Sequence, residues 1–153
     1  GNTRGESVDN GVKFFEERNL EFSHFLIQDA VRPCLEKEDL DKLLKLLGSE
    51  HDGMILGFPV SDTLKKTHYE SSQIIKTVDR NNLWHSQTPQ LFKKESLIKA
   101  LNQTSREKEF TDEAQLLESI GADLVLVKGS SRNIKLTYQD DLKTIKMIIK
   151  TEI

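Results

Sequence analysis

Short apolar runs alternate along this chain with longer stretches in which apolar residues recur at helical intervals. The run from Gly53 to Val60 is continuous and bounded by glycine and proline, which is typical of a strand buried on both faces. Phe25 to Ile27 and the segment ADLVLVKG are further short runs, and Pro33 prevents the first from continuing simply into a helix. This alternation predicts an α/β fold in which helices cover a parallel sheet.

Helical periodicity is clearest in two segments. Val8, Val12 and Phe15 form one apolar stripe and predict a helix from Glu6 to Arg18. Leucines at helical spacing predict another from Glu38 to Leu47, with Gly48 as its C-cap. Further helices are expected at residues 94–101, 112–120 and 139–149.

The segment from Ser61 to Thr88 departs from this rhythm, because it is polar and rich in lysine, threonine, serine and asparagine. Alternating positions around Gln73 to Val78 favour an extended hairpin over a helix. The hairpin has no obvious core to cover in its own subunit, so it is interpreted as a protruding β-arm at about residues 61–88. The whole chain, residues 1–153, is expected to form a single domain.

Composition excludes several classes of function. With 153 residues, 36% of them hydrophobic, the chain suits one core, and its formal charge of -3 shows no basic excess for non-specific nucleic-acid binding. A single cysteine, Cys34, cannot form an internal disulfide, which fits a reducing cytoplasm. The polar opening residues predict no signal peptide or membrane helix, and therefore no membrane partner.

Ligands of such a fold are expected beyond the carboxyl ends of the strands, where Asp29 lies. Asp29 and Arg32 could place a hydroxyl acceptor beside a phosphate-binding fork, or could form a local ion pair that shapes the loop. Thr63, Lys65, Lys66 and Arg80 suit a phosphate monoester, although a solvated hairpin face explains them better on pattern alone.

Other polar positions also have two interpretations. Thr111 or Asp112 is expected to cap a helix, and Thr111 could also help to bind an anion there. Lys135 follows a tight polar turn and is either a ligand-binding cation or an ordinary surface lysine. Trp84 is interpreted as a packing anchor in the core or at an interface. The histidines and acidic clusters show no triad or metal-ligand spacing, so no metal site is expected in the chain.

Six blocks, read in order, closely resemble the 2-C-methyl-D-erythritol 4-phosphate cytidylyltransferase family: GNTRGESV, QDAVRPC, PVSDTLK, TVDRNNLWHSQTPQLF, FTDEA and GSSRNIKLT. The resemblance implies a Rossmann-type, GT-A-like α/β nucleotidyltransferase that joins CTP to methylerythritol phosphate and releases pyrophosphate. It implies Mg²⁺ bound mainly through the CTP phosphates. Such an in-line transfer needs positioning and charge neutralisation more than a covalent protein group.

The resemblance also implies roles for individual residues. The residues implied to bind the methylerythritol moiety and its phosphate are Asp29, Arg32, Thr63, Arg80, Thr111 and Lys135, of which Lys135 is the catalytic positioning residue. Those implied to contact cytidine are Gly1, Asn2, Ser7 and Ala30. Ser7 would offer a hydroxyl to the base, whereas Asn2 stands where the family has an acidic residue. Thr63 and Arg80 are implied to complete the site of a second subunit in a homodimer formed through the arm.

The front of the chain departs from the family. The family's opening strand, its glycine-rich triphosphate loop and the cations that stabilise the pentavalent phosphate are absent from these 153 residues. Without those cations the chain alone is expected to be inactive.

Two alternatives are a ribitol-5-phosphate cytidylyltransferase and a non-catalytic dimerisation or regulatory module. Against the module stand Asp29, Arg32, Thr111 and Lys135, which a scaffold without a ligand would have no physical reason to need.

Overall fold

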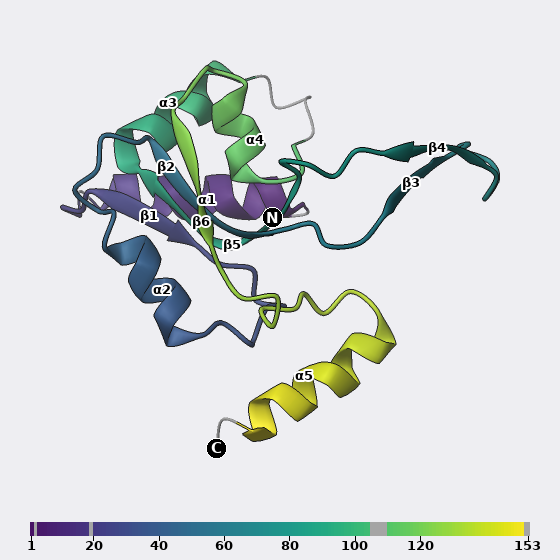
Figure 1. Ribbon diagram of the computed structural model, residues 1–153. Coiled ribbons are helices and arrows are strands. Elements are labelled where there is room, and N and C mark those ends of the chain that lie inside the picture. Colours follow the sequence, from purple (N-terminus) through teal and green to yellow (C-terminus); the bar gives the residue numbers. More distant parts are fainter. Residues whose placement is uncertain (2, 19, 105–109, 152–153) are drawn as a thin grey trace.

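The computed structural model describes residues 1, 3–18, 20–104 and 110–151. Its elements follow the expected alternation of helices and strands (Figure 1). In chain order they are α1 (Arg4–Glu17), β1 (His24–Ile27), α2 (Lys37–Leu44), β2 (Gly53–Pro59), β3 (Leu64–Thr67), β4 (Ile74–Val78), β5 (Trp84–Lys93), α3 (Lys94–Gln103), α4 (Glu113–Glu118), β6 (Leu124–Lys128) and α5 (Gln139–Thr151). The α/β class is therefore confirmed.

The central sheet has four strands in the order β1-β5-β2-β6. β2 and β6 are parallel, but β5 runs antiparallel to both β1 and β2. The expectation of a parallel sheet was therefore wrong, because β5 was not recognised as a strand. Its first residues are polar and were assigned to the arm, yet the stretch from Gln87 to Phe92 is buried. Since β5 is reversed, its N-terminal half lies beside the carboxyl end of β2 and precedes the point where Ile27, the last residue of β1, pairs with Gln90.

The sheet is covered on both faces, which explains the continuous apolar run in β2. Ile55 points into a core with Val12, Leu97 and Leu117 from α1, α3 and α4. The alternate residues Met54 and Leu56 face the other way, into a core with residues of α2. Successive side chains of a strand point to opposite faces, so both faces need apolar residues when both are covered.

The arm is a two-stranded antiparallel hairpin of β3 and β4 that projects away from the sheet (Figure 1). The expected extended hairpin is confirmed, but its expected end at Thr88 is corrected. Residues from Trp84 onward belong to β5, and Trp84 pairs with Pro59 of β2. The backbone N–H of Val60 donates to the carbonyl of Leu83 at 2.9 Å and closes the base of the arm.

Helix ends differ modestly from expectation. α2 ends at Leu44 and its C-cap is Lys45, so Gly48 does not cap it. The backbone N–H groups of Leu46 and Leu47 then donate to the carbonyls of Leu43 and Leu44. Each of these bonds spans three residues, as in a 3₁₀ turn. In the part of the chain that is described, no helix combines the length and apolar character needed to cross a bilayer.

Candidate functional site

A cavity of about 200 Å³ lies where β1 and β6 end and β5 begins. Its walls come from the first turn of α1, the loop after β1, the start of β5, the turn before α4 and the segment after β6. Asp29, Arg32, Thr111 and Lys135 all line it. The structure thus brings together these residues from separate blocks of the sequence.

Asp29 lies among cations in this cavity. Its carboxylate accepts from Arg4 Nε at 3.2 Å and pairs with Lys135 Nζ at 3.1 Å. Its backbone N–H donates to Thr88 Oγ1 at 3.0 Å, which fixes the loop to β5. Burial alone would raise the pKa of Asp29, but the hydrogen bonds from Lys135 and Arg4 outweigh it and lower that pKa. Asp29 is therefore ionised near neutral pH, where it pairs with the neighbouring cations and is a weak proton acceptor.

Arg32 is oriented mainly by carbonyl oxygens. Its Nη1 donates to the carbonyl of Asn133 at 2.8 Å, whereas its Nε lies 3.9 Å from Asp29 Oδ2, too far for a hydrogen bond. That Nε is buried, and no described residue forms a hydrogen bond with it. Burial lowers the pKa of Arg32, and the charge of Asp29 only partly opposes this. The local ion pair considered from the sequence is present but weak, so it does not account for the position of Arg32.

The turn before α4 is held by Asp112. As the N-cap of α4, Asp112 accepts from the backbone N–H of Gln115 at 2.9 Å. Its other oxygen accepts from Ser86 Oγ and Gln90 Nε2 of β5, each at 2.9 Å. Thr111 lies one residue earlier, with its N–H and hydroxyl both directed at Gln115 Oε1. Asp112, not Thr111, is therefore the cap, and it places exposed Thr111 at the edge of the cavity.

Lys135 reaches the cavity from the segment after β6. Its side chain is 44% exposed, so the ammonium group is accessible to a ligand while it pairs with Asp29. The preceding turn is fixed by fully buried Asn133, whose Nδ2 donates to the carbonyl of Thr88 at 2.8 Å. Gln87 Nε2 donates to the carbonyl of Ser130 at 3.0 Å. These buried bonds between β5 and the turn set the position from which Lys135 extends.

Sequence reasoning missed Arg4 and Glu113. Arg4 lines the cavity, and its Nη1 and Nη2 donate to the two carboxylate oxygens of Glu113 at 2.7 Å each. The side chain of Glu113 is 5% exposed. Arg4 and Glu113 stand 109 positions apart, so no local spacing could have paired them. The one available signal was an arginine within the quoted block GNTRGESV.

Other predicted site residues lie outside the cavity lining. Thr63 and Arg80 are exposed on the arm, and pairing of Leu64 with Val78 puts them at the same end of the hairpin. Asn2 lies outside the described residues.

Gly1, Ser7 and Ala30 do not line the cavity, although they belong to the start of the chain, to α1 and to the loop after β1. Gly1 packs against the start of α1, where a Cβ would approach the backbone nitrogen of Ser7 to 2.5 Å. Ser7 Oγ donates to the carbonyl of Thr3 at 3.0 Å. Ala30 is exposed in the turn directly after Asp29.

The described residues contain no group of three or more histidine, cysteine or acidic side chains that could hold a metal ion. Asp29 and Asp112 line the cavity, but Arg4, Lys135 and the donors from β5 already engage them. The residues present therefore do not fit a metal cage built by the protein.

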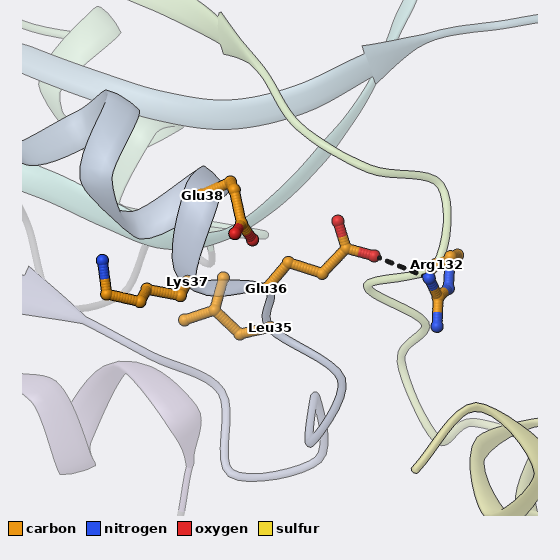
Figure 2. Close-up of a pocket in the computed structure, with 5 residues that line it drawn as sticks. All are labelled: Leu35, Glu36, Lys37, Glu38 and Arg132. Atoms are coloured by element: carbon orange, nitrogen blue, oxygen red, sulfur yellow. Dashed lines mark ion pairs between the residues drawn. The ribbon is translucent and has the colours of Figure 1, made fainter. Parts of the chain in front are cut away.

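A second pocket, of about 330 Å³, lies between the start of α2 and the turn after β6 (Figure 2). Glu36 and Arg132 face each other there as an ion pair at 3.3 Å, whereas the side chain of Lys37 extends away from them. Because positive and negative side chains are mixed, this pocket favours neither anions nor cations. None of the sequence-predicted site residues that the structure describes lines it.

The chain is similar throughout its length to known proteins. A family model described as 2-C-methyl-D-erythritol 4-phosphate cytidylyltransferase matches residues 1–151. Curated proteins of that description from Neisseria gonorrhoeae and Wigglesworthia glossinidia brevipalpis are 42% and 43% identical to it, over 151 and 150 residues. Each match covers 97% of this chain but only 65% and 63% of the relative, so the chain spans less than two thirds of their length.

Solved structures agree with this similarity. The crystal structure of a 4-diphosphocytidyl-2C-methyl-D-erythritol synthase superposes with a TM-score of 0.88 at 40% identity, covering 97% of this chain and 68% of that one. The Francisella tularensis 2-C-methyl-D-erythritol 4-phosphate cytidylyltransferase gives 0.85 at 31% identity, covering 97% and 69%.

Proposed function

The chain belongs to the 2-C-methyl-D-erythritol 4-phosphate cytidylyltransferase family, and on this premise we propose that it forms the sugar-phosphate half of a cytidylyltransferase site. The reaction transfers a cytidylyl group from CTP to methylerythritol phosphate. Its products are CDP-methylerythritol and pyrophosphate, in the non-mevalonate route to isoprenoid precursors. We further propose a cytoplasmic location and that residues 1–153 belong to a single domain.

One observation carries this proposal: Asp29, Arg32, Thr111 and Lys135 line the same cavity although they come from separate parts of the chain. Arginine and lysine are the side chains best suited to a phosphate, and a threonine hydroxyl suits a polyol. Glu113 and Asp29 together engage Arg4, but the side chain of Lys135 stays 44% exposed while it pairs with Asp29. The ammonium group of Lys135 would therefore be available to an anionic ligand in the cavity.

In this proposal a phosphate oxygen of methylerythritol phosphate attacks the α-phosphorus of CTP in line, and the bond to pyrophosphate breaks. Lys135 spends one of its donors on Asp29, and its remaining N–H groups would bind the sugar phosphate. Arg32 lines the same cavity, and its guanidinium charge would attract the sugar phosphate. Neither group has to exchange a proton, because positioning and charge stabilisation lower the barrier of this transfer.

Gly1, Ser7 and Ala30 are proposed to meet the cytidine, together with Asn2. No GxGxxG or GxxxxGK[ST] sequence occurs in the 153 residues. Mg²⁺ would be carried by the CTP phosphates. A homodimer through the arm would bring Thr63 and Arg80 to a partner's cavity.

The test is a pyrophosphate-release assay on the full-length gene product that contains this chain, with CTP, Mg²⁺ and methylerythritol phosphate. We expect turnover with methylerythritol phosphate and little with ribitol 5-phosphate. Lys135→Gln should lower kcat/KM by about a hundredfold, because an interaction with the reacting phosphate is lost. Lys45→Gln, at an exposed position just after α2, is the matched control and should leave it unchanged. Preference for ribitol 5-phosphate would refute the substrate assignment, and no pyrophosphate would refute the activity.

A further inference from the structure

Arg4 is held by carboxylates on both sides. Its Nη1 and Nη2 donate to the two oxygens of Glu113 at 2.7 Å, and its Nε donates to Asp29 at 3.2 Å. All the nitrogens of the guanidinium group are therefore engaged by the protein itself. Lys135 differs, because among the described residues its side chain pairs with Asp29 alone and remains 44% exposed.

The pair of Arg4 and Glu113 has the geometry of a strong ion pair. Two parallel N–H···O bonds of 2.7 Å form the bidentate fork that only arginine offers to a carboxylate. Glu113 is 5% exposed, and no other hydrogen bond to its side chain is seen in the described part of the chain. Although burial opposes the charge of Arg4, its bonds to Glu113 and Asp29 raise the pKa of Arg4, so the cation persists.

The location of the pair gives it a specific consequence. Arg4 is the first residue of α1, beside Gly1 and Ser7, whereas Glu113 is the first residue of α4, just after Thr111. The same guanidinium group also holds Asp29 in the loop after β1. A single side chain thus joins the turn proposed to meet cytidine to both segments proposed to meet the sugar phosphate.

We propose that Arg4, clamped by Glu113, is a positioning residue that sets the cytidine-binding turn relative to the sugar-phosphate cavity and so makes binding of the two substrates interdependent. This inference rests on the proposed function. Arg4 acts through its neighbours in this account, since Glu113 and Asp29 leave none of its nitrogens without a protein partner. In-line transfer requires both substrates within a narrow geometry, so a small shift between the segments slows the reaction.

Two variants test this role: Arg4→Lys keeps the positive charge of the side chain, and Glu113→Gln keeps the shape of the side chain. Arg4→Lys retains the positive charge, but one ammonium group cannot form the bidentate bond and also reach Asp29. Glu113→Gln changes a residue that does not line the cavity, and it removes the charge that holds Arg4. Arg18→Lys is the matched control, because Arg18 lies at the other end of α1 and packs over the ring of Phe14.

The experiment measures the affinity of the full-length gene product for CTP with and without saturating methylerythritol phosphate, together with kcat and both KM values. We expect each substrate to improve binding of the other in the wild type. Arg4→Lys and Glu113→Gln should each abolish this synergy and lower kcat/KM by about tenfold to a hundredfold. Arg18→Lys should retain both.

The outcomes separate the two claims. A wild-type protein without cytidylyl transfer refutes the proposed function. An active wild type whose Arg4→Lys and Glu113→Gln forms keep the synergy refutes the positioning role, as does an equal loss in Arg18→Lys. If only one variant folds by circular dichroism, that variant decides. If neither folds, the pair is needed for the fold itself and the positioning role is overturned.

Discussion

Replacing Asp29 by asparagine tests whether charge holds the cavity together. Asparagine keeps nearly the same shape, but it leaves Arg4, Arg32 and Lys135 close together without their shared anion. A hydrogen bond between charged groups contributes about 1.5–3 kcal/mol when shielded. Arg4 and Lys135 are 33% and 44% exposed, so each contact is discounted toward the lower value of surface pairs. We expect a loss of about 1–2 kcal/mol in the free energy of unfolding near neutral pH.

The stability difference between the wild type and Asp29→Asn should depend on pH. The pKa of Asp29 is lower in the folded protein than its ordinary value of 3.8, because Lys135 and Arg4 outweigh the effect of burial. A lowered folded-state pKa stabilises the protein above the unfolded-state pKa, and this stabilisation disappears as the pH falls through the folded-state value. The difference between wild type and variant should therefore be constant from about pH 5 to about pH 8 and should shrink below 3.8.

Urea denaturation followed by circular dichroism, at about pH 7 and about pH 3.5, measures both quantities. Asp62→Asn, at an exposed carboxylate beside the arm, is the matched control and should change neither. An Asp29→Asn protein as stable as the wild type at neutral pH would refute the reasoning. A deficit of the same size at both pH values would show that the lost contribution is not the charge.

Further expectations concern packing, capping and the arm. Gly53→Ala would bring a Cβ within 2.5 Å of Phe92 in the core, so we expect the free energy of unfolding to fall by about 1–3 kcal/mol. Thermal unfolding measures this, and an unchanged midpoint would contradict the packing. Asp112→Ala removes the cap of α4 and its bonds to β5, and urea denaturation should show a loss of about 1–3 kcal/mol, with an unchanged midpoint as the refuting result. Arg80→Gln and Lys135→Gln subunits, each impaired alone, should regain activity when mixed if Arg80 serves a partner's cavity; no recovery despite subunit exchange would oppose the arm-mediated site.

Much of the architecture was accessible from local patterns. Apolar residues recur at helical spacing in α1 but form a continuous run in β2, because α1 buries one stripe and β2 is covered on both faces. The polar segment before β5 was recognised as a hairpin because its positions alternate. Asp29 was expected at the end of a strand, where ligands of such folds are bound, and it lines the cavity.

The rest depended on which segments meet in space. β5 escaped recognition because buried Gln87 and Gln90 make it look like a surface segment, whereas their side chains donate across the fold to Ser130 and Asp112. Arg4 and Glu113 look like ordinary first-turn residues of separate helices. The sequence by itself therefore determined the elements and the chemistry available at their ends. Only the tertiary structure decided the pairing of Arg4 with Glu113, because a contact across 109 positions leaves no periodic signal.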